Sequence, residues 1–181
     1  MRDPRFPPLP TLRPSQLWVI EQAPATALSE LDREALTSAN VVIYDRVLAG
    51  VVADVLPLGG YAEPLSFGCQ VTGQALSPRA LQFAADGFSV VQLVEASPCW
   101  RERLHQAPRE LSQVGDAGIA VVRLIEKRGA ESYKELGADL DQLPGLTDNV
   151  DHDHPMTVIF GPIAARSTAQ LYPFTANGLA G

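Results

Sequence analysis

Short apolar runs alternate with helical patterns along most of this chain, and that alternation constrains the fold more than any other feature. Runs such as Leu17–Ile20, Val41–Tyr44 and Ser89–Val94 have the length and the apolar character of buried strands. The segments between them have the composition and spacing of helices. Because strands that alternate with helices pair in parallel, the sequence predicts an α/β fold, with a mostly parallel sheet and helices on both faces.

Local signals mark where two of the helices begin or end. Thr26 or Ser29 can cap the helix after the first run, and Ser29 followed by Asp32 resembles a capping box with aspartate in place of glutamate. A second helix is expected over residues 78–86. Gly87 follows it directly, so we expect this glycine to end the helix.

The pattern weakens in the last third of the chain. Residues 126–143 are charged and contain two glycines, so we expect a short helix around Ala130–Leu136 and otherwise loop. Residues 148–153 are polar and are expected to form a linker. Thr157–Phe160 is expected to be a last strand, followed by a helix from Ile163 to about Leu171.

Composition limits the possible partners. With 181 residues and 46% hydrophobic content, the chain can bury the core of one domain with a small appended piece. Its net charge of -7 argues against nucleic acid and against an anionic membrane surface, which both need a basic footprint. Two cysteines are too few for a disulfide framework, and no apolar run approaches the length of a membrane span. We therefore expect a cytoplasmic protein.

The first 16 residues form a proline-rich arm. Its prolines remove backbone donors and favour extended geometry; they are Pro4, Pro7, Pro8, Pro10 and Pro14. Two interpretations stay open: a loosely ordered arm that packs on its own domain, or a ligand for an aromatic groove.

Two sets of polar residues are candidates for a functional site. Asp45 and Arg46 follow a buried run directly, and the carboxyl end of an α/β strand is where such folds bind ligands. Asp45 could equally cap the next helix or pair with Arg46, and Arg46 could be a solvated surface residue. The run Asp151–His154 contains metal-ligating types. Adjacent residues in a linker rarely converge on one ion, however, so we predict no metal site.

Three segments resemble the S-adenosylmethionine-dependent tetrapyrrole methylases, in particular the uroporphyrinogen-III C-methyltransferases. Leu17–Leu48 ends in NVVIYDRVL and is similar to the family's strand, loop and helix followed by DVVLYDRLV. Gly87–Trp100 resembles the family's G-x-x-VVRL-x-GGDPF strand and loop. Met156–Gly181 resembles its strand TLV-x-YMG with a later GLP turn. The likeness implies a first domain over 17–125, a linker or irregular segment over 126–156, and a remnant of the second domain over 157–181.

The resemblance also implies an activity: methyl transfer from S-adenosylmethionine to a porphyrinogen or corrin precursor, in sirohaem or cobalamin synthesis, by a homodimer. Asp45 would be catalytic, because a carboxylate there could bind pyrrole N–H groups or accept the proton released after C-methylation. Arg46 would bind a substrate propionate. Six residues would bind the cofactor: Ser97, Pro98, Gly145, Thr147, Phe160 and Gly161.

The chain departs from the family in its glycine loops. The first loop, G-x-G-P-G-D in most members, corresponds to Val19–Pro24, which contains no glycine. The second, GGDP, corresponds to Glu95–Pro98, which keeps only the proline. Glycine lets a ligand approach the backbone closely, so side chains in place of these glycines would hinder cofactor binding. The stretch Leu143–Thr147, similar to the family's VPGIT loop, can equally be an ordinary turn. The alternative function is a non-catalytic descendant that binds a tetrapyrrole or a protein partner.

Overall fold

The computed structural model describes residues 10–65, 72–114, 122–127, 133–151 and 153–163. The strands are β1 Leu17–Gln22, β2 Val41–Tyr44, β3 Tyr61–Pro64, β4 Val90–Glu95, β5 Val122–Lys127, β6 Tyr133–Ala138 and β7 Met156–Phe160. The α-helices are α1 Glu30–Ser38, α2 Ala49–Val55, α4 Pro78–Ala85, α5 Pro98–Arg103, α6 Ala107–Val114 and α7 Leu143–Thr147. Short 3-10 turns are η1 Arg46–Leu48, η2 Leu104–Gln106 and η3 Leu140–Gln142.

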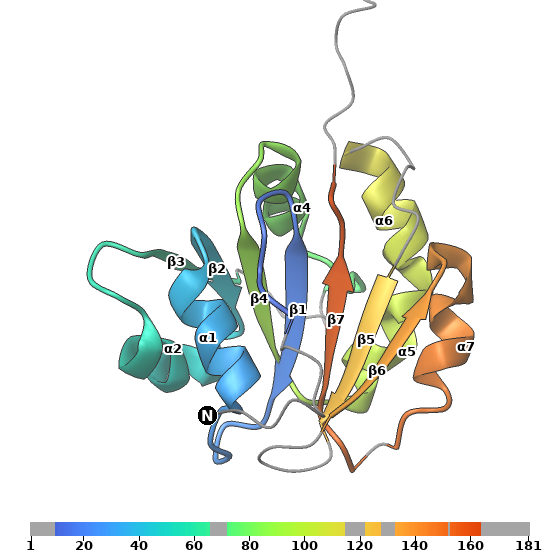
Figure 1. The fold of residues 1–181 in the computed structure, drawn as a ribbon, viewed down its shortest axis with the longest axis horizontal. Coiled ribbons are helices and arrows are strands. Elements are labelled where there is room, and N and C mark those ends of the chain that lie inside the picture. The colour runs from blue at the N-terminus through green and yellow to red at the C-terminus, as the bar shows by residue number, and fades with distance from the viewer. Residues whose placement is uncertain (1–9, 66–71, 115–121, 128–132, 152, 164–181) are drawn as a thin grey trace, which may run out of the picture.

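All described strands belong to one seven-stranded sheet with the order β3-β2-β4-β1-β7-β5-β6 (Figure 1). β3, β2, β4 and β1 are paired in parallel. β7 runs antiparallel to β1 and to β5, and β6 antiparallel to β5. β5 therefore points the same way as β1, and five of the seven strands share one direction. The predicted α/β fold with a mostly parallel sheet is confirmed.

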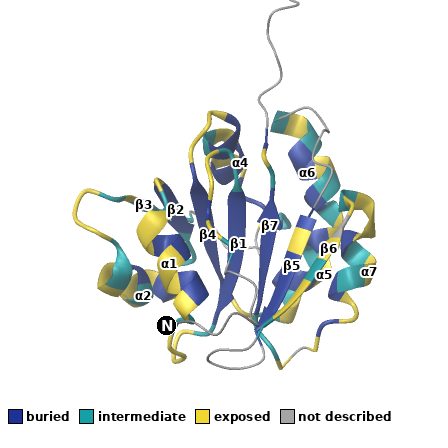
Figure 2. Ribbon diagram, viewed as in Figure 1, coloured by how far each residue is buried: buried dark blue, intermediate teal, exposed yellow. Residues whose placement is uncertain are grey.

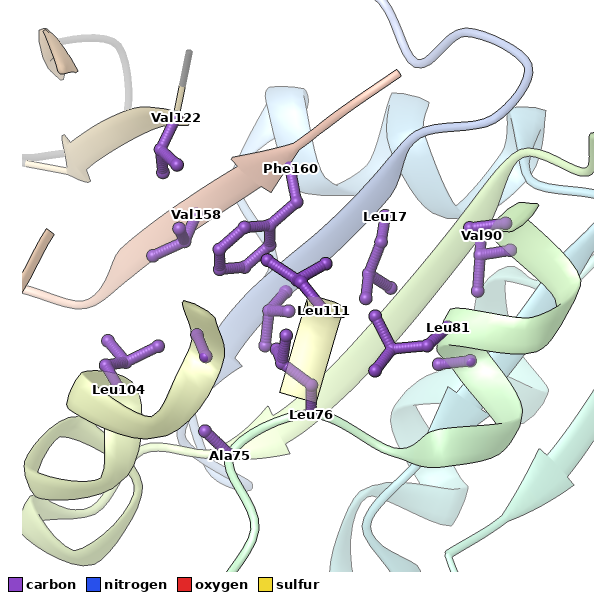
Figure 3. Close-up of a cluster of buried hydrophobic side chains, with 14 of the residues drawn as sticks. Leu17, Ala75, Leu76, Leu81, Val90, Leu104, Leu111, Val122, Val158 and Phe160 are labelled. Carbon is purple, nitrogen blue, oxygen red and sulfur yellow. The ribbon is translucent and has the colours of Figure 1, made fainter. Parts of the chain in front are cut away.

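The helices cover both faces of the sheet, which separates the core into two layers (Figure 2). Alternate residues of β1 face opposite layers: Leu17 and Val19 pack toward α4 and α6, whereas Trp18 and Ile20 pack toward α1 and α2. Figure 3 shows the first layer, where Phe160 and Leu17 point from the sheet toward the helices. Both faces of the central strands are thus buried, as their nearly continuous apolar sequences require.

The helix boundaries follow the expected local chemistry. Of the two candidate caps, Ser29 is the N-cap of α1: its Oγ accepts a hydrogen bond from Asp32 N at 3.1 Å and donates to Asp32 Oδ2 at 2.6 Å. Gly87 follows α4 with φ of +97°, a conformation that favours glycine. Its N–H donates to Ala84 O at 3.1 Å. Both predicted boundaries are confirmed.

The predicted helix around Ala130–Leu136 is wrong for its described part. Tyr133–Ala138 is β6, an edge strand whose Leu136 lies opposite Leu124 of β5. Tyr133 packs against one core layer and Leu136 against the other, as residues three apart do on a strand. This segment forms a strand because it pairs with β5, and the charged local sequence gives no sign of that pairing. Residues 130–132 lie outside the described part, as do the arm's residues 1–9 and the predicted last helix beyond Ile163.

β7 confirms the predicted last strand and places it in the middle of the sheet. It lies between β1 and β5, with Phe160 opposite both Leu17 and Val122. The polar segment before it is anchored, because Val150 is buried and the carbonyl of Asp151 accepts a hydrogen bond from Arg101 at 3.2 Å. The division of the chain into two domains stays a prediction. In the part of the chain described, no helix has the length and apolar character needed to cross a membrane.

Candidate functional site

A cavity of about 250 Å³ lies where β2, β3 and β4 end, on the face of the sheet covered by α4 and α5. Ile43 and Asp45 line it from β2 and the residue after it, and Gln92 and Val94 line it from β4. The segment before α4 forms the opposite wall, and Trp100 of α5 lies at one end. The carboxyl ends of parallel strands are the usual ligand site in open α/β sheets. Its position makes this cavity a candidate ligand site.

Asp45 joins the ends of β2 and β4. Its Oδ2 accepts a hydrogen bond from Glu95 N at 2.7 Å, and its side chain does not cap η1. Burial raises the pKa of the Asp45 carboxyl; the bond from Glu95 N opposes this effect, and the Glu95 charge adds to it. Arg46 is exposed and is not among the lining residues. Asp45 therefore neither caps the next helical turn with its side chain nor forms an ion pair with Arg46.

Side chains from the sheet and from α5 hold the wall opposite Asp45 in place. Gln92 Oε1 accepts from Ser77 N at 2.8 Å, and Gln92 Nε2 donates to Ala75 O at 3.0 Å. Trp100 Nε1 donates to the same carbonyl at 3.0 Å. A loop segment that is itself buried therefore has its backbone groups paired with side chains, as burial requires.

Glu110 of α6 completes this support. Its two carboxylate oxygens accept from Ala75 N at 3.1 Å and Leu76 N at 2.8 Å. Burial raises the pKa of Glu110, while the two backbone N–H groups and the nearby His105 lower it by less. Sequence reasoning missed this residue. The available signal was an acidic residue between Ala107 and Leu111, at helical spacing from these apolar residues.

An exposed ion pair borders the cavity on the β3 side. Arg79 Nε lies 2.8 Å from Glu63 Oε1, and the hydroxyl of Tyr61 donates to the same carboxylate. The guanidinium also lies 4.9 Å from the centre of the Phe83 ring. Burial alone would raise the pKa of Glu63, but the bonds from Tyr61 and Arg79 and the Arg79 charge outweigh it and lower the pKa. Glu63 already has a cationic partner.

The end of β1, by contrast, is filled by buried charges. Glu21 is fully buried, and its carboxylate accepts from Arg101 Nε at 2.8 Å and Arg101 Nη2 at 2.7 Å. The N–H of Met156 donates to the same carboxylate at 2.9 Å. Arg101 also donates to the carbonyls of Asp151 and His154, so this ion pair ties α5 to the segment that enters β7.

A second buried pair lies on the other face at the same edge. Lys127, at the end of β5, donates from Nζ to Asp32 Oδ2 at 2.7 Å and to Glu21 O at 3.3 Å. Asp32 Oδ1 accepts from the Thr157 hydroxyl at 3.1 Å. Sequence reasoning assigned Asp32 to a capping box and did not identify the lysine that neutralises it.

The predicted site residues do not form one site. Asp45, Ser97 and Pro98 lie at the carboxyl edge, and Ser97 is the N-cap residue of α5 without a side-chain capping bond. Gly145 and Thr147 belong to the single turn of α7, which packs against η2. The Leu143–Thr147 stretch is therefore helical.

Phe160 and Gly161 lie at the opposite edge of the sheet, because β7 runs antiparallel and Phe160 pairs with Leu17, the first residue of β1. The Phe160 ring is fully buried in the core (Figure 3). Gly161 has φ of +124°, and a Cβ there would lie 2.8 Å from Ser15 O. Close packing of two backbone segments accounts for this glycine.

These placements bear on S-adenosylmethionine, the cofactor that the sequence resemblance implies. The resemblance implies a bare, glycine-rich backbone over Val19–Pro24, yet this stretch contains Glu21, whose buried side chain pairs with Arg101. Phe160 and Gly161 face a different edge from Ser97. The residues present do not fit the cofactor in the expected arrangement. Among the described residues, no group of three or more potential ligands is placed to hold a metal ion.

No protein-family model matches the chain, and no curated protein matches it. Among solved structures it is similar to the uroporphyrin-III-C-methyltransferase from Thermus thermophilus, with 16% identity, a TM-score of 0.40, and coverage of 81% of this chain and 91% of that one. It is also similar to cobalt precorrin-4 methyltransferase, with 12% identity, a TM-score of 0.35, and coverage of 80% and 94%. Likeness at this level concerns the fold.

Proposed function

We propose that this chain is a non-catalytic binding protein on a tetrapyrrole-methylase-like scaffold, with the cavity beside Asp45 as its ligand site. The observation that carries the proposal is the buried Glu21–Arg101 pair. Glu21 belongs to the Val19–Pro24 stretch that the sequence resemblance aligns with the glycine-rich cofactor loop, and its buried carboxylate stands near the end of β1. Removing one partner from such a pair leaves an uncompensated buried charge, so this end of the sheet resists reopening for a cofactor.

The size of the cavity limits the ligand. Its volume of about 250 Å³ is smaller than the roughly 300–1,000 Å³ of pockets that enclose drug-sized ligands. A compact molecule, or one arm of a larger one, would fill it. A whole tetrapyrrole would extend beyond it. The predicted homodimer and the cytoplasmic location stay predictions.

The second candidate is an active S-adenosylmethionine-dependent methyltransferase acting on uroporphyrinogen III. Asp45 favours it, because this carboxylate stands at the strand end where the resemblance expects the catalytic group, and burial raises its pKa toward the range of a proton acceptor. The two candidates differ in whether the chain binds the cofactor.

Calorimetric titration of the full chain with S-adenosylhomocysteine separates them. We expect no heat of binding at millimolar ligand. A companion assay follows transfer of labelled methyl groups from S-adenosylmethionine to uroporphyrinogen III, and we expect none above a heat-denatured control. Micromolar affinity together with methyl transfer would overturn the proposal and establish the second candidate.

A further inference from the structure

The cavity offers a carboxylate, and several hydrogen-bond donors around it already have acceptors. Gln92 Nε2 and Trp100 Nε1 both donate to Ala75 O. The N–H of Ser77 donates to Gln92. The N–H groups of Ala75 and Leu76 donate to Glu110. An anion that entered would therefore find these donors already engaged, and it would have to displace buried hydrogen bonds to use them.

The acidic groups differ in the partners they already have. Glu63 is bound by Arg79, the one basic side chain among the residues that line the cavity in the described structure. Asp45 accepts a single hydrogen bond, at Oδ2, from a neutral backbone group. Its Oδ1 accepts none from the residues that the structure describes. The exposed carboxylate of Glu95 adds further negative charge beside it.

We infer that this cavity binds a compact organic cation, a primary ammonium group on a short apolar chain, with Asp45 as its counter-ion. The inference rests on the proposed function in one respect, namely that the cavity is the ligand site. An ammonium group has three donors and no acceptor, so it can donate to Asp45 Oδ1, which accepts no hydrogen bond from the described residues. Ile43, Val94 and Trp100 supply the apolar surface for the chain of such a ligand.

The electrostatics of Asp45 support the same ligand class. Burial and the Glu95 charge raise the pKa of this carboxyl, which means that its ionised form is poorly stabilised in the free protein. A cation in contact with Oδ1 would relieve that cost, and the hydrogen bond formed would be charge-assisted. The whole chain, with net charge -7, also attracts cations.

Three ligands of nearly equal size test the inference: n-butylammonium, n-butanol and butyrate. Each is titrated at pH 7 into the ¹⁵N-labelled full chain, and amide chemical shifts are followed. We expect saturable shifts around Asp45, Ser77 and Glu95 with butylammonium alone, at low millimolar affinity. Asp45→Asn should weaken binding about tenfold or more, because a neutral hydrogen bond replaces a charge-assisted one.

Two further variants make the test specific. Asp54→Asn removes an exposed carboxylate of α2 and should leave the affinity unchanged. Arg79→Met removes the cation that occupies Glu63 and should tighten butylammonium binding several-fold. Thermal unfolding of each variant checks that it is folded.

The outcomes distinguish this inference from the proposed function. Equal affinity for butanol and butylammonium, preference for butyrate, no binding of any of the three, or unchanged binding by Asp45→Asn would each overturn the cation assignment. None of these results restores a cofactor site. Micromolar binding of S-adenosylhomocysteine together with methyl transfer would overturn the non-catalytic proposal and would leave selective butylammonium binding at Asp45 standing.

Discussion

The carboxyl ends of the parallel strands form two regions that differ in how their charged side chains are paired. At the ends of β1 and β5, Glu21 and Lys127 are buried and each is paired with an opposite charge. At the ends of β2 and β4, Asp45 is only partly buried, and a backbone N–H is its one described partner beside a cavity. α5 serves both regions, since Trp100 lines the cavity and the next residue, Arg101, binds Glu21.

The difference between the two regions lies in the partner of each carboxylate: Glu21 has a buried counter-charge, and Asp45 stands beside a cavity. The long side chain of Glu21 is buried near the end of β1 and is tolerated because Arg101 neutralises it. Within the described ranges of the chain, no cation pairs with Asp45, so that carboxylate can accept a further hydrogen bond from a ligand. A polar group in a cavity that still has an unused hydrogen-bonding position indicates a ligand site more strongly than a polar group whose hydrogen bonds are all made.

The largest expected effect comes from breaking the buried pair in the region of Glu21. Arg101→Ala should lower the free energy of unfolding by about 3–5 kcal/mol, because Glu21 would remain buried without a counter-charge. Urea denaturation measures the change. Arg109→Ala, an exposed arginine on the neighbouring α6, is the matched control and should have little effect. A loss below about 1 kcal/mol would show that water reaches Glu21 and that this region is open.

The next effect concerns the wall of the cavity in the region of Asp45. Glu110→Leu leaves the N–H groups of Ala75 and Leu76 without their acceptor, at about 1–3 kcal/mol for each buried donor. Glu110→Gln keeps one acceptor oxygen and should cost less. Both variants should also weaken butylammonium binding, since the wall opposite Asp45 loses its support. Glu102→Gln, on the exposed side of α5, is the control. If Glu110→Leu were as stable as the wild type, another group would have to accept the hydrogen bonds of Ala75 N and Leu76 N.

A smaller effect is expected in the pH dependence of stability. The folded pKa of Asp45 lies above its ordinary value of 3.8, so the folded state binds this proton more tightly than the unfolded state. The contribution of Asp45 to stability is therefore unfavourable at neutral pH and is relieved as pH falls through the raised pKa. Asp45→Asn should remove this contribution from urea midpoints measured between pH 7 and pH 4. If the urea midpoints of the wild type and of Asp45→Asn differed by the same amount at every pH in this range, the raised pKa of Asp45 would be contradicted.

The same carboxyl sets the pH dependence of ligand binding. Butylammonium needs ionised Asp45, so its affinity should fall as pH drops through the raised pKa, while the amine itself stays protonated. The shift titration repeated at several pH values measures this fall. Constant affinity down to pH 4 would place the ammonium group against another residue.

Local chemistry explains which parts of this fold could be predicted from the sequence. β2 and the cap at Ser29 depend on neighbouring residues, so apolar runs and capping pairs identified them. β6 depends on pairing with β5, which its charged sequence does not reveal. Site residues followed the same division. Asp45 was predicted as a candidate because it directly follows a strand, but the partnership of Glu21 with Arg101 joins residues 80 positions apart and is set by tertiary packing.

The smallest expected effect compares the exposed ion pair beside the cavity with the buried pair in the region of Glu21. Arg79→Ala breaks a contact to Glu63 at 2.8 Å, close to the Glu21–Arg101 distance of 2.7 Å, but the Arg79 side chain is 60% exposed. Water screens such a pair, so we expect only a small loss in the free energy of unfolding, reduced further at high salt. Urea denaturation at two salt concentrations measures it. A loss as large as that of Arg101→Ala would show that Arg79 stabilises the fold mainly through its contact with Phe83, and that burial does not set the difference between the two regions.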